Sequence, residues 1–229
     1  MVPRRADAFT TARARESPPA RVSHRPRERR PFGPGAVRGP SRIRGTGMGT
    51  LFLRRLSRWQ AETERDQIAD LFAAALRDPA PDAVPPDRAA FLRRFVDHDV
   101  QQPEFDLVLA GDPSPAGCAY GFLAERDGGW WSRFRERPEA LPQLAENRRV
   151  FVVAQLLVHP RRRGQGLAGR LQRELLSRAS APLALLLLEP GNGPAQAAAQ
   201  ALGWSKTGQL TPSEGTPLGA WTIPLGRHG

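Results

Sequence analysis

The chain has 229 residues and a formal net charge of +11, and its length fits one large core with an appendage. Its single cysteine, Cys118, excludes an intrachain disulfide and a cysteine-rich zinc site. No apolar run reaches the roughly 20 residues that span a bilayer, and no apolar stretch follows the early arginines as a secretory signal requires. These features predict an intracellular, cytoplasmic protein without a membrane segment.

Residues 1–47 carry much of the positive charge, with twelve arginines against three acidic residues. They are rich in Pro, Gly and Ser, so they cannot bury enough apolar surface to offset their chain entropy. We expect a disordered extension at 1–47 and a folded domain at 48–229. The extension is either a solvated tail or upstream sequence translated from a misplaced start, because Met48 stands where the ordered pattern begins. We favour both over an arginine-rich segment that contacts nucleic acid.

The first half of the ordered region predicts a strand, two helices and two strands. In the first helix, Ile68 and Phe72 recur at helical spacing, and four prolines follow it. Asp87 is suited to cap the second helix, which presents Phe91 and Phe95 on one face. The expected elements are a strand at 51–57, a helix at 59–77, the helix capped by Asp87, strands at 105–111 and 116–125, and irregular structure at 127–147.

The second half alternates strands with helices. The clearest strand is 149–158, and Leu167, Leu171 and Leu175 recur every fourth residue in the helix that follows. The remaining expected elements are a buried strand at 182–189, an alanine-rich helix at 194–202 and a closing strand at 219–225. Helices between neighbouring core strands predict an α/β (α+β) layer architecture.

Three arginines and two glycines separate the strand at 149–158 from the helix that begins near Leu167. Glycines at a strand-to-helix junction let the backbone approach a ligand, and the first turn of a helix offers N–H groups and the positive end of its dipole. Because the arginines add positive charge, the segment suits a pyrophosphate. Gly164, Gly166 and Gly169 have the spacing GxGxxG, but we do not interpret the segment as the dinucleotide motif. It is not a Walker loop either, since it contains no GK[ST] sequence.

These residues resemble the acetyl-CoA motif of the GNAT N-acetyltransferases, Q/R-x-x-G-x-G/A. Arg161–Gly166 fits this motif, and Val158–Pro160 supplies the V-x-P that customarily precedes it. A second family motif, N-x-x-A-x-x-x-Y-x-x-x-G-F, is matched in spacing by Asn192, Ala195, Ala199, Gly203 and Trp204. Either motif alone is weak, but both occur in the right order with a strand between them. The resemblance covers 149–204 by motif and 51–225 by element order.

The resemblance implies a mixed, mostly antiparallel central sheet flanked by helices, with acetyl-CoA as cosubstrate and no metal. It implies transfer of an acetyl group to a primary amine by direct attack in a ternary complex. The acceptor would be a small molecule or a peptide, and the protein would be a monomer or a homodimer. An acyl-CoA-binding protein with little or no transferase activity is the alternative.

The resemblance also places the cofactor-binding residues. The backbone of three strand residues would contact the pantetheine arm, namely Leu156, Leu157 and Val158. The pyrophosphate would lie, mostly through main-chain N–H groups, against Arg161, Arg162, Arg163, Gly164, Gln165, Gly166, Leu167 and Ala168. Asn192 would lie beside the pantetheine, and it is also suited to cap a helix.

Two positions depart from the family pattern. Many relatives carry Glu where this chain has Gln155, which cannot act as a base, and many carry Tyr where this chain has Ala199. Positioning and carbonyl polarisation then supply much of the rate. Gln155 and Tyr120 are the catalytic candidates, although Tyr120 is alternatively a packed sheet residue.

Further side chains are candidate parts of the site. The other candidates for moving protons are Glu125, Asp127 and His98. Trp130 and Trp131 either wall an acceptor pocket or pin a loop to the core. Cys118 is expected to be a small buried strand residue rather than a nucleophile.

The charge of one segment bears on the acceptor. In this family the first two helices flank the acceptor side, and residues 61–112 hold twelve acids against five arginines. Acidic walls concentrate cations by long-range attraction that salt weakens. The sequence therefore predicts a cationic amine as the acceptor.

Removal of residues 1–47 is expected to leave the folded domain unchanged, because their composition does not suit a packed core. A chain that begins at Met48 should keep the melting temperature and the CoA affinity of the full chain, measured by thermal unfolding and calorimetric titration. A large loss of either would show that the extension packs onto the domain.

Overall fold

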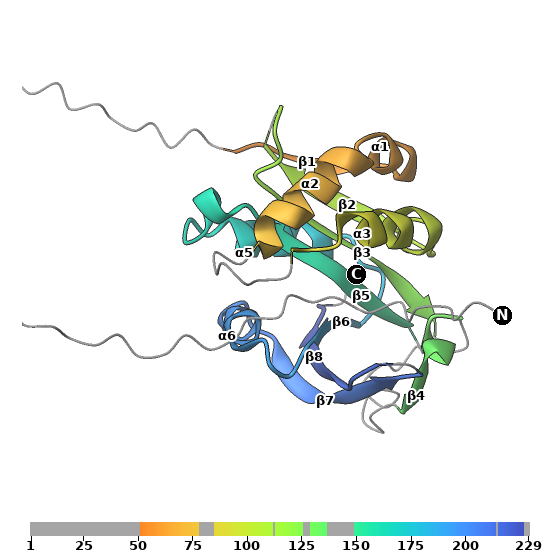
Figure 1. Cartoon of the computed structure of the whole chain (residues 1–229). Coiled ribbons are helices and arrows are strands. Elements are labelled where there is room, and N and C mark those ends of the chain that lie inside the picture. Colours follow the sequence, from red (N-terminus) through yellow and green to blue (C-terminus); the bar gives the residue numbers. More distant parts are fainter. Residues whose placement is uncertain are drawn as a thin grey trace, which may run out of the picture. The chain divides into compact units, whose positions relative to one another are not determined.

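The computed structural model describes residues 51–77, 85–111, 113–125, 129–136, 149–213 and 215–226 (Figure 1). The expectations for the extension at 1–47 and for Asp127 lie outside these residues. None of the helices in the described part of the chain is both long and apolar enough to cross a membrane.

The described strands form an eight-stranded mixed sheet in the order β1-β2-β3-β5-β6-β8-β7-β4. Neighbouring strands are antiparallel except for β5 and β6, which are parallel. This arrangement confirms the predicted mixed, mostly antiparallel sheet. The strands are β1 (Leu53–Leu56), β2 (Asp106–Ala110), β3 (Gly117–Glu125), β4 (Phe134–Glu136), β5 (Arg149–Val158), β6 (Leu183–Leu188), β7 (Ser205–Pro212) and β8 (Leu218–Pro224).

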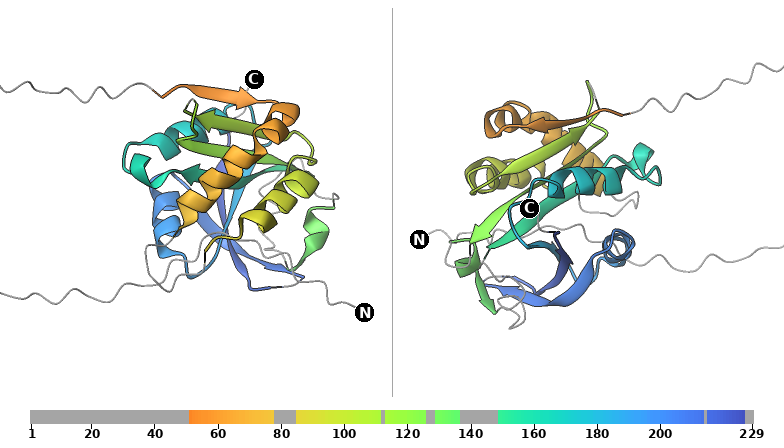
Figure 2. Two further views of the ribbon diagram at one scale, coloured as in Figure 1. Left: turned by 45° about the horizontal axis from the view of Figure 1, so that its top comes forward. Right: turned by 180° about the vertical axis from the view of Figure 1, so that it is seen from behind.

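Helices cover both faces of the sheet (Figures 1 and 2). On one face lie α1, α2 and α3, where Ile68, Phe72 and Phe91 form one apolar cluster with strand residues such as Leu107. On the other face lie α5 and α6, where Leu171 belongs to a second cluster. The helices are α1 (Arg58–Thr63), α2 (Arg65–Leu76), α3 (Arg88–Arg94), α5 (Leu167–Leu176) and α6 (Gly193–Ala201), and a π-helical turn, Phe95–Asp99, continues α3.

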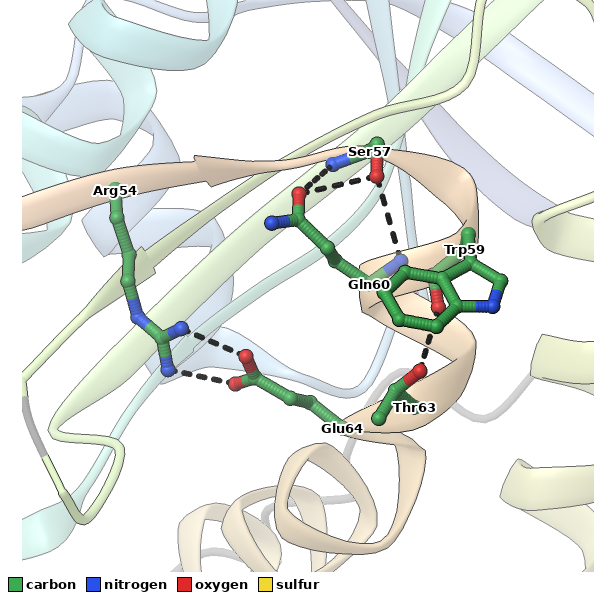
Figure 3. Close-up of polar contacts among 6 residues, drawn as sticks. All are labelled: Arg54, Ser57, Trp59, Gln60, Thr63 and Glu64. Carbon is green, nitrogen blue, oxygen red and sulfur yellow. Dashed lines mark hydrogen bonds and ion pairs between the residues drawn. The ribbon is translucent and has the colours of Figure 1, made fainter.

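The single helix predicted at 59–77 is wrong, because the chain breaks at Glu64 into α1 and α2. Ser57 and Gln60 cap α1 reciprocally: the Gln60 N–H donates to Ser57 Oγ, and the Ser57 N–H donates to Gln60 Oε1 (Figure 3). Arg54 of β1 donates to both carboxylate oxygens of Glu64, at 2.6 and 2.7 Å. This ion pair ties the break to β1, a long-range contact that helical periodicity does not contain.

Two strands do not follow from the sequence pattern. β7 has mostly polar and exposed residues in its first half, and its register against β8 shifts at Gly208, so it shows no regular alternation. β4 lies inside the segment predicted to be irregular, is only three residues long, and pairs with Thr211 and Pro212 of β7. β7 pairs with β8, which is mostly buried, and β4 pairs in turn with β7. Their cause is therefore tertiary rather than local.

Candidate functional site

The parallel strands β5 and β6 separate before β5 ends. Their pairing covers three positions, from Phe151 opposite Ala184 to Val153 opposite Leu186. β5 continues to Val158 and stays paired with β3. Among the described strands, none pairs with the β6-facing edge of β5 beyond Val153. Backbone groups on that edge are therefore open to a ligand, as at any exposed strand edge.

A bulge in β5 accompanies the separation. Tyr120 of β3 lies opposite Gln155, whereas the next residue, Gly121, lies opposite Val153, which leaves Ala154 as the extra residue. A bulge bends its strand and re-aims the side chains beside it. Because cross-strand neighbours share a face of the sheet, Gln155 lies on the same face as Tyr120, which packs in the apolar cluster of α2 and α3.

The loop between β5 and α5 contains two glycines with left-handed backbone. After a 3₁₀ turn at Pro160–Arg162, Gly164 has φ +72° and Gly166 has φ +70°. Gly166 is the N-cap of α5, and no side chain caps the first N–H groups of the helix. A Cβ atom at either glycine would meet none of the described atoms within 4 Å. The loop therefore presents N–H groups and open space at the positive end of α5, which suits an anion.

The three arginines of this loop have two different environments. Arg161 and Arg162 are exposed, and the amide of Gln165 donates to the Arg161 carbonyl at 3.3 Å. Arg163 instead donates to the carbonyl of Ala75 in the last turn of α2, where the helix dipole favours a cation. Arg163 thus fixes the loop to α2, while Arg161 and Arg162 lie on the surface beside the glycines.

Asn192 follows β6 and caps α6. Its side-chain oxygen accepts the N–H of Ala195 at 3.1 Å, and the residue is 3% exposed. The structure confirms the predicted cap, and a contact with pantetheine stays a prediction. Because β5 and β6 are parallel, the loop after β6 and the glycine loop after β5 lie at the same end of this strand pair.

A pocket with a volume of about 40 Å³ lies where β5 and β6 separate. By volume it accepts about three water molecules, or a small polar group such as an amine. The lining residues that matter for its chemistry are Arg94, Asp99, Trp130, Arg133, Gln155 and Leu187. The pocket joins the end of the π-helical turn on one side to the bulge of β5 on the other.

Gln155 brings an unpartnered amide to this pocket. The residue is only 7% exposed, and its side chain forms no hydrogen bond with any residue that the structure describes. Its amide atoms are not among the buried polar atoms without a partner, so they stay accessible to a ligand or water that completes their hydrogen bonding. The structure thus places the sequence candidate Gln155 in the pocket, with donor and acceptor capacity but no titratable group.

Asp99 supplies a buried carboxylate to the same pocket, with 5% exposure. Tyr120 Oη donates to its Oδ2 at 2.9 Å, and Arg94 Nε donates to the same oxygen at 3.3 Å. Burial raises the pKa of Asp99, which outweighs the opposing effects of Arg94 and Tyr120. Burial also raises the pKa of the Tyr120 phenol well above its usual value, so this hydroxyl stays protonated and acts as the donor.

Sequence patterns did not reveal Asp99 and Arg94. These residues are five apart, whereas an ordinary α-helix brings together residues three or four apart. The π-helical turn Phe95–Asp99 supplies the change of period. The nearby Asp97 is exposed, and nothing in the sequence distinguishes it from the buried Asp99. A π-helical turn has no composition signal that would have identified the pair.

The other candidates for proton transfer are less well placed. His98 and Glu125 are exposed and do not line the described part of the pocket. Tyr120 is fully buried and contacts Asp99 rather than the pocket itself. Its position suits a role in holding the carboxylate more than direct contact with a substrate.

Of the two tryptophans in the 129–136 segment, Trp130 has both of the roles that the sequence suggests. Trp130 lines the pocket, and its ring packs against Trp131, Phe134 and Phe122 of β3. It therefore walls the pocket and anchors its own segment to the sheet. Cys118 is buried on β3, and burial raises the pKa of its thiol to about 12, as a packed strand residue requires.

Arginines pair with part of the acidic excess of residues 61–112. In the described part of this segment six acids form ion pairs, namely Glu64, Asp66, Asp70, Asp99, Glu104 and Asp106. The described lining of the pocket holds two guanidinium groups and one carboxylate. This part of the pocket therefore gives no support to the predicted cationic acceptor.

Solved structures share this arrangement of strands, helices and loops. A protein of the GNAT family from Desulfovibrio desulfuricans aligns with a TM-score of 0.51 and 13% identity, over 77% of this chain and 99% of its own. The chain has the GNAT fold. The ribosomal-protein-S18-alanine N-acetyltransferase from Escherichia coli aligns with a TM-score of 0.50 and 13% identity, over 78% and 97% of the two chains. An aminoglycoside acetyltransferase in complex with coenzyme A aligns with a TM-score of 0.50 and 18% identity, over 76% of this chain and 95% of its own.

No protein-family model and no curated protein sequence matches the chain. Within its GNAT fold, both motifs found in the sequence fall at the separation of β5 and β6. The acetyl-CoA motif forms the loop from β5 to α5, and the second motif begins at Asn192 directly after β6. The fold and the motifs therefore converge on one end of one parallel strand pair.

Proposed function

We propose that the protein is an acetyl-CoA-dependent N-acetyltransferase that transfers an acetyl group to a primary amine by direct attack in a ternary complex. The observation that carries this proposal is the open edge of β5 beyond Val153. This edge leads from the glycine loop that follows Val158 to the pocket at Gln155. One strand thereby connects an anion site to a small polar pocket.

The residues of the site fit coenzyme A. The uncapped N–H groups of α5 and the open space at Gly164 and Gly166 suit its pyrophosphate, with Arg161 and Arg162 on the surface beside them. The free edge of β5 suits its extended amide-containing arm, because amides pair with strand backbone. When bound, acetyl-CoA supplies an activated thioester.

The side chains at the pocket favour catalysis by positioning. The amide of Gln155 is able to hold the acceptor amine or a water, but it cannot remove a proton at ordinary pH. Ala199 is buried and offers no acid for the leaving thiolate, whose proton then comes from water. Holding an amine against a thioester in the right geometry supplies much of a rate enhancement.

The proposal is tested by incubating acetyl-CoA with a panel of small-molecule and peptide primary amines. Thiol release is followed continuously, and mass spectrometry identifies an acceptor heavier by one acetyl group. Thiol release that depends on both enzyme and acceptor supports the transferase. Tight CoA binding without acetylation of any amine would instead favour the acyl-CoA-binding protein.

The same panel of primary amines tests which charge the acceptor carries. The sequence predicts a cationic amine, whose rate should fall with rising salt because screening weakens long-range attraction. Matched cationic, neutral and anionic amines of similar size are compared at two ionic strengths. Turnover of neutral or anionic acceptors alone would show that expectation to be wrong.

Replacing Gln155 by alanine should lower kcat/KM about fivefold, the value of one neutral hydrogen bond of about 1 kcal/mol. The pH dependence of the reaction should remain, because an amide does not titrate. Gln209, which is exposed on β7, gives the matched control Gln209→Ala, with rates that should equal the wild type. Loss of the pH dependence in Gln155→Ala would contradict this role.

A further inference from the structure

The pocket brings together two polar side chains from distant parts of the chain. Asp99 ends the π-helical turn after α3, and Gln155 follows the bulge of β5. Around them lie apolar residues such as Val152, Ala154 and Leu187. A carboxylate in such surroundings is unfavourable unless hydrogen bonds and charges stabilise it.

The hydrogen bonds of Asp99 are uneven between its two oxygens. Tyr120 and Arg94 both donate to Oδ2. Oδ1 accepts no hydrogen bond from any described residue. Asp99 and Gln155 line the same small pocket, so the open acceptor capacity of this carboxylate and the amide of Gln155 are both available to one ligand there. An N–H group satisfies the carboxylate oxygen of Asp99 and the amide oxygen of Gln155 alike.

We propose that Asp99 accepts, through Oδ1, the proton that the acceptor amine loses, and that Arg94 and Tyr120 are positioning residues for this carboxylate. The inference rests on the proposed acetyl transfer. It assigns the role of proton acceptor to a residue outside the family motifs. It also explains how the reaction proceeds with Gln155 at the position where many GNAT sequences carry Glu.

Acetyl transfer and proton transfer both occur in the ternary complex. The lone pair of the amine nitrogen forms a bond to the thioester carbonyl carbon, and the carbon–sulfur bond breaks with its electron pair leaving on sulfur. The proton from nitrogen goes to Asp99 Oδ1, which becomes a carboxylic acid. Water protonates the thiolate, and Asp99 returns its proton to solvent after the amide has left.

The surroundings of Asp99 suit this role from each side. Arg94 on α3 and Arg133 beside Trp130 favour the ionised carboxylate, and the Tyr120 hydroxyl on β3 does the same by donating a hydrogen bond. Gln155 on β5 carries no charge. Burial opposes all three and raises the pKa of Asp99 overall, which makes its carboxylate a stronger base than an exposed one.

The main test compares Asp99→Asn with Asp97→Asn, a matched change at an exposed aspartate of the same turn. Loss of a general base lowers rates by about 10²–10⁴, so kcat/KM of Asp99→Asn should fall at least a hundredfold. Its CoA affinity by calorimetry should stay within about twofold of the wild type. Asp97→Asn should match the wild type in both measurements. Turnover of a folded Asp99→Asn protein within about threefold of the wild type would overturn the proposal.

Tyr120→Phe gives a second test that does not need the first variant to fold. Activity requires ionised Asp99 and is therefore lost as pH falls through its pKa. Because the Tyr120 hydrogen bond lowers that pKa, its removal should move the acidic limb of kcat/KM to higher pH. An unshifted limb in a folded Tyr120→Phe protein would contradict the proposal.

A readout without turnover separates this inference from the proposed function. Carbon-13 NMR of labelled aspartate follows the Asp99 carboxyl in the protein alone, with Asp99→Asn identifying its signal. Its titration should move to higher pH in Tyr120→Phe, as the activity limb does. Wild-type protein that acetylates no amine overturns both proposals. Wild-type activity that Asp99→Asn retains overturns only the role of Asp99.

Discussion

Replacement of Gly164 by aspartate should weaken CoA binding a hundredfold or more while the chain stays folded. The glycine loop presents main-chain N–H groups to an anion, and a carboxylate placed there repels the ligand and competes for those donors. Each charge-assisted hydrogen bond that is lost costs roughly 1.5–3 kcal/mol. Two such bonds correspond to about a hundredfold or more in affinity.

The fold should survive this change for two structural reasons. A Cβ atom at Gly164 meets no described atom within 4 Å, so the substitution produces no clash in the protein itself. Its φ of +72° costs a side chain roughly 1–2 kcal/mol, and Asp and Asn are among the residues that tolerate this conformation best. Gly164→Asn is therefore the matched control, with the same shape and strain but no charge.

Calorimetric titration of CoA into both folded variants separates charge from backbone strain. Gly164→Asn should lose much less affinity than Gly164→Asp. Undiminished affinity in Gly164→Asp would show that the loop is only a turn. The acetyltransferase proposal would then lose the anion site on which it depends.

Replacement of Gly121 by alanine should lower the free energy of unfolding by about 3 kcal/mol, the upper end of typical overpacking costs. An added Cβ would lie 2.3 Å from the carbonyl oxygen of Val152 and 2.6 Å from the ring of Phe151. The carbonyl belongs to β5 and cannot swing away as a flexible side chain does. Since Gly121 lies at the bulge that positions Gln155, turnover should fall with stability.

Denaturant titration measures this change, with Gly129→Ala as the control. Gly129 is exposed, and a Cβ atom there would meet none of the described atoms within 4 Å. The unfolding midpoint of the Gly129→Ala protein should therefore equal that of the wild type. A Gly121→Ala midpoint equal to the wild type, at an unchanged slope, would show that β3 and β5 separate without cost at this position.

Local patterns predicted most of the elements because their causes are local. The strand at 149–158 has a continuous apolar run, and the helix from Leu167 has a regular apolar face, so each agrees with the structure within about a residue. The sequence also predicts a glycine loop between them, as the structure shows. Its left-handed glycines have φ values that few other residues adopt, so the sequence itself carries the signal.

The remainder depends on contacts that no local pattern contains. β7 forms through its pairing with β8, and the break at Glu64 accompanies an ion pair with Arg54. Arg163 looks like its neighbours in sequence, yet it binds the end of α2. Asp99 enters the pocket only because the chain adopts a π-helical turn. The sequence thus predicts the glycine loop more completely than the residues that line the pocket.

The central claim is that the glycine loop and the open edge of β5 form one binding site for CoA. Amide hydrogen exchange with and without saturating CoA, read out by mass spectrometry, tests it most directly. Binding should slow exchange in peptides that cover 154–158 and 164–169, while α1, at Arg58–Thr63, should exchange at an unchanged rate. Bound CoA that protects other segments and leaves both of these peptides unchanged would contradict the account.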